Sequence, residues 1–376
     1  MPQPATHYLV TRFAIPEEYY STWWDPYKQY FGLGSCAPDF FYFPLMPKKV
    51  IGDVKEDLSW ENIANPLHSS NSYDMFCNLL AVAKQTKMNA STLVEEKNAN
   101  KQFAFSFGYC CHVVTDCIFH PYVYRSTGDL WHTTDKTAET LHKQQELFID
   151  NELYRKYYSR DKIYKMSVTC SEESTELLDF SIAKFFAESL KSTYPDCLPK
   201  EDIEISTESE THPIQQAYKA LIKTIPFLFE STKICLWGSK LSIDINISDL
   251  VSNFSNNFLT SPYENCPSLP EFSPNDLFHF SIIESYKIFN EALKFWNSDS
   301  DNPKNFFHDN PVNYLDAGNF NLDTGLPSNC NNYKLLRSIG DEHYSFMADI
   351  LTNNYNYFKL DYQNFDKSIL ENKQLL

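Results

Sequence analysis

The sequence predicts an all-α protein, and three observations favour that fold class over a sheet protein. Only 9 of the 376 residues are glycine, well below the usual share of roughly 7%. Hydrophobic residues make up 43% of the chain, and over residues 73–85 they recur at helical spacing. The segment from Phe103 to Tyr122 is apolar on every face, which is typical of a central, buried helix.

Frequent prolines and glycines divide the first part of the chain, residues 1–72, so we expect short helices joined by loops there. Side chains that carry chemistry in this region would then lie on loops. Residues 73–85 have apolar positions at helical period and predict a helix. Residues 88–101 are polar and indicate a connector.

The central buried helix should end at Pro121, because a proline has no amide hydrogen to continue the hydrogen-bond ladder. A loop through Gly128 then leads to a second helix over 136–158. Four further helices are expected, at 172–193, 213–232, 274–296 and 340–358. Ser273 is the expected N-cap of the third of these.

The C-terminal half is interrupted by 241–272 and 297–335, which are rich in Asn, Asp, Ser and Pro and predict long irregular loops. Residues 241–247 alternate like a short strand. We therefore expect a helical domain over 1–240 and a C-terminal helical extension with Asn-rich loops over 241–376, packed onto the same domain or separate from it.

A net charge of -17 opposes any function that depends on neutralising a phosphate backbone, so duplex nucleic acid is not an expected partner. No stretch approaches the roughly 20 apolar residues of a membrane span, although peripheral contact with a membrane is compatible with the composition. The first ten residues lack the features of a signal peptide. A cytoplasmic protein, or one exported without a cleavable signal peptide, is expected. The ten cysteines form no CxxC pair, which favours reduced, structural thiols.

The most apolar helix carries three polar side chains spaced by four, His112, Asp116 and His120, and this spacing places them on one face. Burying them among apolar residues costs several kcal/mol unless partners or a metal compensate. The second helix has His142 and Glu146 at the same spacing. Alone, the His112 and Asp116 pair is more typical of a buried hydrogen bond, and the His142 and Glu146 pair is more typical of a solvated pair on a helix. Together the two pairs favour a metal site.

The N-terminal region adds His7, Asp39 and His68 to these five residues. Five imidazoles and three carboxylates provide enough nitrogen and oxygen ligands for two or three zinc ions. Asp116 is the best placed carboxylate to bridge two ions. A bridged pair of zinc ions would lower the pKa of a shared water to near neutrality and so supply a nucleophile.

The order of these residues is specific. An early His7 is followed by Gly-x-x-x-Pro-Asp at 34–39, and His68 follows before a helix. The motif Gly-Tyr-x-x-His-x-x-x-Asp-x-x-x-His-Pro spans 108–121, and His-x-x-x-Glu spans 142–146. In this order the chain resembles the zinc-dependent phospholipase C family, also described as phospholipase C/D, which includes the catalytic domain of glycosylphosphatidylinositol-specific phospholipase D.

The resemblance covers roughly residues 5–155 and implies a multi-helix bundle of the zinc-dependent phospholipase C and zinc nuclease type. It also implies hydrolysis of a phosphodiester in a phospholipid by a zinc-activated water. Asp39 and Asp116 are the expected catalytic residues, Asp39 either as a ligand or in orienting the water. The expected zinc ligands are His7, Asp39, His68, His112, Asp116, His120, His142 and Glu146.

Two departures from the secreted bacterial phospholipases leave alternatives open. In those enzymes the second helix histidine lies six residues after the bridging aspartate, whereas His120 lies four after Asp116, so His132 is a competing ligand. They also ligate zinc through the amine of an N-terminal Trp, and this chain begins Met1-Pro2. Asp150, one turn beyond Glu146, is interpreted as a surface carboxylate, with the orientation of a ligand as the alternative.

Two other functions remain open from the sequence. A single-strand-specific zinc nuclease has the same fold, but its last ligand pair is usually His-x-x-x-Asp, and this chain has Glu146. A non-catalytic, zinc-binding interaction protein would be expected to have lost at least one ligand. Early aromatic residues near Asp39 are expected in the core, with a cage for a quaternary ammonium group as the alternative. They are Trp23, Trp24, Phe40, Tyr42 and Phe43.

Overall fold

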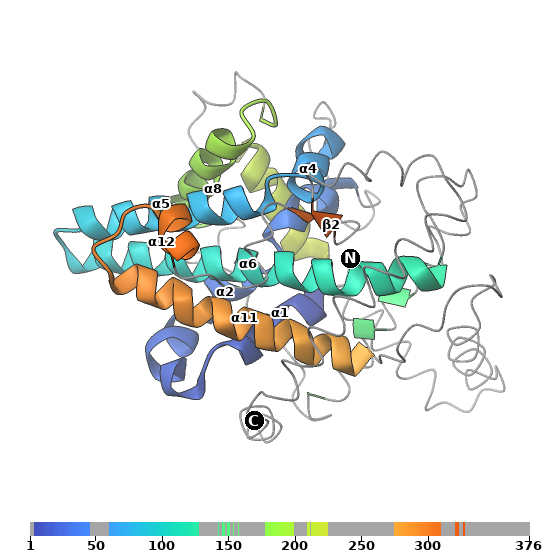
Figure 1. Cartoon of the computed structure of the whole chain (residues 1–376). Coiled ribbons are helices and arrows are strands. Elements are labelled where there is room, and N and C mark those ends of the chain that lie inside the picture. Colours follow the sequence, from blue (N-terminus) through green and yellow to red (C-terminus); the bar gives the residue numbers. More distant parts are fainter. Residues whose placement is uncertain are drawn as a thin grey trace.

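A computed structural model gives the structure of the protein, which is dominated by helices (Figure 1). It describes residues 4–45, 60–127, 142, 145, 146, 149, 150, 153, 157, 177–198, 209, 210, 212–224, 274–309, 320–322, 326 and 327. Within these residues the strands are limited to β1 (Phe320–Asn321) and β2 (Leu326–Pro327), which pair antiparallel. The prediction of an all-α fold is confirmed.

Short helices form the N-terminal region, as predicted: α1 (Pro4–Ala14), η1 (Glu17–Tyr19), η2 (Tyr20–Trp24), α2 (Asp25–Gly34), η3 (Ala37–Leu45) and α4 (Trp60–Ser69). The expectation that its chemistry lies on loops is wrong, because His7 lies in α1, Asp39 in η3 and His68 in α4. Prolines such as Pro26 and Pro38 occupy the first turns of helices, where a missing amide hydrogen costs little.

Helix α5 (Ser72–Asn89) confirms the helix predicted over 73–85, but the connector predicted over 88–101 is largely helical. Helix α6 (Leu93–Thr127) begins at a capping box, in which the Thr92 hydroxyl accepts from the Glu95 amide and the Glu95 carboxylate accepts from the Thr92 amide. The capping box therefore starts a helix in a segment whose polar composition predicts a connector.

The predicted end of this helix at Pro121 is also wrong, because α6 continues through the proline to Thr127. A proline inside a helix removes one backbone hydrogen bond without always ending the helix. The turn that carries His120 is therefore held within a continuous helix and not at a frayed end.

Beyond α6, the described residues of the predicted helix over 136–158 are all helical. Helix α8 (Phe180–Thr193) begins later than the predicted 172, because the Asp179 side chain accepts from the Ser181 amide and caps it. The helix predicted over 213–232 is present over 213–224, and its remainder lies outside the described residues.

In the C-terminal half, α11 (Pro274–Asn297) confirms the helix predicted over 274–296. The stretch 297–335 was expected to be loop, yet it includes α12 (Pro303–Asp309) and the two short strands. Asn302 caps α12, since its side chain accepts from the Asn305 amide. Ser273, the strand-like 241–247, the loop over 241–272 and the helix over 340–358 lie outside the described residues.

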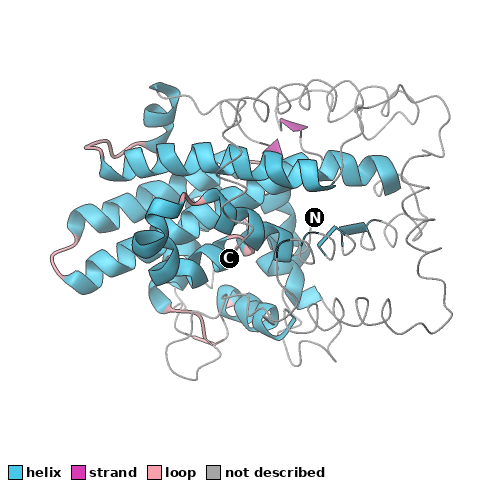
Figure 2. Ribbon diagram, turned by 90° about the horizontal axis from the view of Figure 1, so that it is seen from below, coloured by secondary structure: helices cyan, strands magenta, loops and turns pink. Residues whose placement is uncertain are grey.

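Helix α6 is the centre of the structure, and α2, α5 and α11 all pack against it (Figures 1 and 2). Helix α1 contacts α2, α6 and α11, so α11 shares its neighbours with the N-terminal helices. The division at residue 240 stays a prediction. Among the described residues, no helix combines the length and the apolar character needed to cross a bilayer.

Two glycines allow α2 and α6 to approach closely. A Cβ atom on Gly34 would lie 2.1 Å from the carbonyl oxygen of Phe105, and one on Gly108 would lie 2.2 Å from that of Phe31. Both contacts are with backbone atoms, which cannot move aside as a side chain can. The glycines of the two sequence motifs therefore set the distance between α2, which precedes the η3 helix with Asp39, and α6, which carries His112.

We expect Gly108→Ala to destabilise the protein by about 1–3 kcal/mol, the usual cost of overpacking. An alanine in an open helical position would instead stabilise the helix by roughly 1 kcal/mol over glycine, so the sign of the change is informative. Urea unfolding of the zinc-free chain measures the difference. A variant as stable as the wild type, or more stable, would contradict the close approach of the helices.

Candidate metal centre

Three buried groups of histidine and carboxylate side chains lie on the inner faces of the helices. In each group the donor atoms lie within 4.8 Å of one another, a spacing that suits a shared metal ion. Together they contain all eight predicted zinc ligands: His7, His112 and Asp116; Asp39, His68 and His112; and His120, His142 and Glu146. The structure thus brings together residues from α1, η3, α4, α6 and the helical segment after α6.

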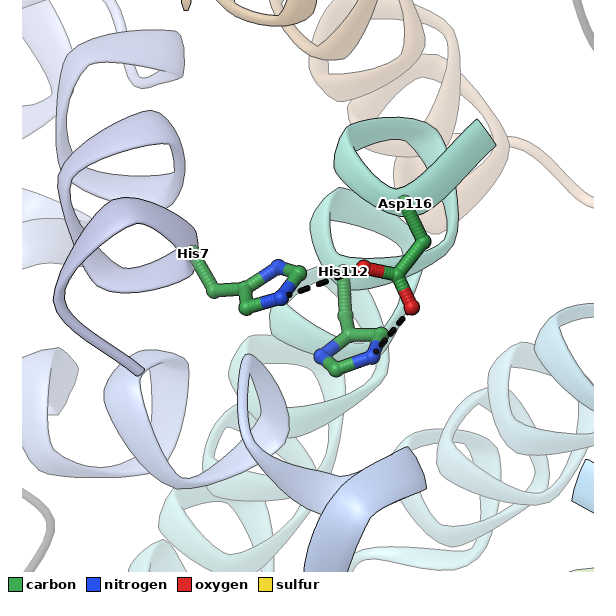
Figure 3. Close-up of side chains that lie close together, drawn as sticks. All are labelled: His7, His112 and Asp116. Carbon is green, nitrogen blue, oxygen red and sulfur yellow. Dashed lines mark ion pairs between the residues drawn. The ribbon is translucent and has the colours of Figure 1, made fainter. Parts of the chain in front are cut away.

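The first group joins α1 to α6 (Figure 3). The Nε2 atom of His7 lies 3.3 Å from Oδ1 of Asp116, and Nε2 of His112 lies 3.0 Å from Oδ2. The two imidazole rings are stacked, with their centroids 3.8 Å apart. Each carboxylate oxygen of Asp116 therefore faces a different imidazole, as a carboxylate does when it serves two ions.

The nitrogen and oxygen atoms in these contacts lie at ion-pair distances, but they are not aligned as hydrogen bonds. Among the described residues, no hydrogen-bond partner satisfies either nitrogen of His7, Nε2 of His112 or either oxygen of Asp116. All three side chains are fully buried. Buried polar atoms that converge without hydrogen bonds are costly, and a cation between them would remove that cost.

The electrostatics of this group fit a cation. Burial, together with the neighbouring His112, lowers the pKa of His7, so its imidazole is neutral and can donate a lone pair. Burial opposes ionisation of Asp116, but His112, His120 and His7 together hold its pKa well below the usual range. Burial alone would lower the pKa of His112, yet the carboxylates of Asp116 and Asp39 raise it. Zinc binds neutral imidazole and ionised carboxylate, so a bound ion would take the place of the proton that these carboxylates favour on His112.

The second group shares His112 with the first. The Nε2 atom of His68 lies 3.1 Å from Oδ1 of Asp39, and Nε2 of His112 lies 3.9 Å from the same oxygen. Asp39 is 5% exposed, whereas Asp116 is 0% exposed. Asp39 is therefore the carboxylate of these two groups that solvent reaches.

The third group lies one turn farther along α6. His142 and Glu146 are joined by a contact of 2.7 Å between Nε2 and Oε1, and Nε2 of His120 lies 3.8 Å from the same oxygen. Burial is the main cause that lowers the pKa of His120 to about 3, so this imidazole is also neutral. His132 lies outside the described residues.

Backbone carbonyls fix the orientation of three of the imidazoles. Nδ1 of His68 donates to Ala64 O at 3.2 Å and Nδ1 of His112 to Ser35 O at 2.8 Å. Nδ1 of His120 donates to the carbonyl of Leu322. A carbonyl oxygen only accepts, so the neutral rings of His112 and His120 carry their proton on Nδ1 and present a lone pair at Nε2. Nε2 of His68 also faces an acceptor, Oδ1 of Asp39 at 3.1 Å, so this ring has acceptors at both nitrogens. This arrangement of supporting hydrogen bonds is typical of zinc-bound histidine.

The interpretation of Asp150 as a surface carboxylate is wrong, since Asp150 is only 4% exposed. Its carboxylate accepts hydrogen bonds from the amides of Ala5 at 3.1 Å and Thr6 at 2.9 Å, and from the Thr6 hydroxyl. Burial raises the pKa of Asp150 to about 7 against these hydrogen bonds. Asp150 thus caps the N-terminus of α1, the helix that carries His7.

This cap and the carbonyl partners of the histidines were not predicted from the sequence. Asp150 follows His142 by eight residues, which places it on the same helical face, and this spacing was the available signal. Among the early aromatic residues, Phe40, Phe43 and Trp24 are buried in the core. Tyr42 is partly buried, and its ring centroid lies 5.0 Å from that of His68.

The family model for zinc dependent phospholipase C matches residues 11–222 of this chain. The match covers more than half of the sequence, and the protein therefore belongs to this family. No curated protein and no solved structure matches the chain. Family membership supports a zinc-dependent, phospholipase-like hydrolase, and the donor atoms of the three groups fit zinc in their chemistry.

We expect Asp150→Ala to lower the free energy of unfolding by about 1–2 kcal/mol, the cost of losing an N-cap, and to weaken zinc binding at the group that contains His7. The matched control is Asp179→Ala, which removes another largely buried cap, that of α8. Urea unfolding and zinc titration of both variants measure the two effects. Equal zinc binding in the two variants would contradict a role of Asp150 in positioning His7.

Proposed function

We propose that the protein is a zinc-dependent phosphodiesterase that hydrolyses phospholipids in the manner of a phospholipase C. The observation that carries the proposal is the set of three buried groups of zinc-type donors, two of which share His112. Family membership supports the same reaction class. Within the described residues, several buried nitrogen and oxygen atoms of the first group have no hydrogen-bond partner. A purely structural role for these side chains therefore does not explain why they are buried.

In this proposal the two or three zinc ions are held by the eight residues of the three groups. His7, His112 and Asp116 form one set, Asp39, His68 and His112 form the adjacent one, and His120, His142 and Glu146 form the third. Nε2 of His112 has a single lone pair, so His112 would ligate only one of the two ions whose sets contain it. Sets of two or three nitrogen and oxygen ligands leave a coordination position for water or substrate, as in catalytic zinc sites.

Bound zinc would supply a Lewis acid for the phosphate oxygens and a water of lowered pKa as the nucleophile. Asp116 would ligate zinc through both oxygens, because they face different imidazoles. Asp39 has one oxygen near His68 and is the more exposed carboxylate, so it can ligate zinc or accept a proton from the attacking water. Both are proposed catalytic residues.

The acidic composition favours a zwitterionic or neutral lipid over an anionic one, because a net charge of -17 repels an anionic membrane surface. Contact with the lipid would be peripheral. Cleavage on the glycerol side gives diacylglycerol and a phosphorylated head group, and cleavage on the other side gives phosphatidic acid. The identity of the products distinguishes phospholipase C from phospholipase D.

The test is metal analysis of the purified chain together with hydrolysis of a panel of phospholipids and of single-stranded DNA. We expect at least two zinc ions per chain, phospholipid cleavage that is lost on chelation and recovered with zinc, and no cleavage of DNA. Cleavage of DNA alone would favour the nuclease. Stoichiometric zinc without cleavage of either substrate would favour a non-catalytic zinc-binding protein.

Asp116→Ala should abolish hydrolysis and reduce the zinc content, because it removes both oxygens that face the two imidazoles. Asp116→Asn keeps the shape of the side chain and loses its charge, and we expect severe impairment as well. Zinc content and initial rates on the best phospholipid check both variants. Turnover at the wild-type rate in either variant would refute the bridging role.

His120→Ala should lose zinc from the third group, whereas His132→Ala should not. His120 is held on α6 with its Nδ1 atom bonded to a carbonyl and its Nε2 atom near Glu146. Zinc titration of the two variants compares them directly. Loss of zinc in His132→Ala with normal binding in His120→Ala would mean that the arrangement of the secreted bacterial enzymes applies.

A further inference from the structure

A short segment from the far C-terminal part of the chain lies against the candidate metal centre. We define the β1–β2 segment as residues 320–322, 326 and 327, in which Phe320 pairs with Pro327 and Asn321 pairs with Leu326. Strand β1 packs against α4, α5 and α6, the first and last of which carry His68 and His120. This segment lies outside the part of the chain that the family model matches.

The backbone of Leu322 joins two of the groups. Its amide donates to the carbonyl oxygen of His68 at 2.6 Å, and its carbonyl oxygen accepts from Nδ1 of His120. His68 and His120 belong to different groups and lie on different helices. One peptide backbone therefore fixes the position of α4 relative to α6 at the level of the metal centre.

The contact with His120 decides which nitrogen of the ring is available. Because a carbonyl oxygen cannot donate, the proton of the neutral ring lies on Nδ1, and the lone pair lies on Nε2. Nε2 is the nitrogen that lies near Glu146. Ser35 supplies the equivalent carbonyl to His112, but it is part of the N-terminal motif, whereas Leu322 lies 202 residues from His120.

The segment is anchored by the side chain of Leu322, which is fully buried in the core. A buried leucine resists displacement, so it holds its own amide and carbonyl at fixed positions. We propose that the β1–β2 segment is a working part of the metal centre, with Leu322 as a positioning residue that fixes His120 in the metal-binding tautomer and ties it to His68. The inference rests on the proposed function.

The test compares Leu322→Ala with two controls in the full-length chain. Leu322→Ala removes the anchor and leaves the backbone groups in place, and Leu322→Ile restores most of the buried volume. Leu293→Ala removes a buried leucine from α11, near the end of that helix that packs on Phe103 through Trp296. The Leu293→Ala variant therefore measures the effect of truncating a core side chain away from the metal centre.

The first readout is the tautomer of His120 in the zinc-free chain, measured by NMR with ¹⁵N-labelled histidine and assigned through His120→Gln. We expect a proton on Nδ1 in the wild type, Leu322→Ile and Leu293→Ala, and a mixture of tautomers in Leu322→Ala. The second readout is zinc titration. Leu322→Ala should bind one ion roughly 10–100-fold more weakly, the usual effect of removing a hydrogen-bond partner of a metal ligand.

An unchanged tautomer together with unchanged zinc affinity in Leu322→Ala would overturn the inference, as would an equal loss of zinc affinity in Leu293→Ala. Recovery of both readouts in Leu322→Ile would support it. A wild-type chain that binds no zinc would refute the proposed function. In that case the tautomer of His120, which is measured without metal, would still decide the inference about Leu322.

Discussion

Burial of lone pairs that face one another is the constraint on which the structure depends. In His68 and His112 one ring nitrogen faces a backbone carbonyl and the other faces a carboxylate oxygen 3.0–3.1 Å away, so a neutral ring has one proton for two acceptors. Two acceptors at that distance repel each other unless a proton or a metal ion lies between them. In an apolar interior this repulsion is poorly screened, so the helices can pack in this way only if positive charge compensates.

Helix α6 makes the arrangement possible because it is both the centre of the core and the source of three donor side chains. Its apolar faces bind α2, α5 and α11, and the face with His112, Asp116 and His120 is turned toward the other donors. Gly34 and Gly108 bring α2 close enough for the carbonyl of Ser35 to reach His112. The packing of the core and the orientation of the ligands therefore depend on the same contacts between helices.

Much of the fold was predictable, because helices leave periodic patterns in the sequence. The spacing of His112, Asp116 and His120 places them on one face wherever the helix begins or ends, so the errors at 88–101 and Pro121 did not affect the site. The error at 88–101 came from composition, which a capping box at Thr92 overrides, and the error at Pro121 came from treating a proline as the end of a helix.

The supporting contacts of the site were much less predictable. Asp150 caps a helix that lies more than 140 residues earlier in the chain, and Leu322 contacts His120 through its backbone. A backbone carbonyl is present at every residue, so no pattern of side chains marks the one that orients a ligand. The side chains that would bind zinc can be recognised in the sequence from their residue types and spacing. The contacts that orient these side chains form only when the chain folds.

Anomalous scattering at the zinc edge, from crystals of the purified chain, would show whether these three groups hold zinc. We expect at least two zinc peaks, each among the donor atoms of a group that contains His7, His68 or His120. Crystals without zinc, or with zinc bound only to other residues, would contradict this expectation.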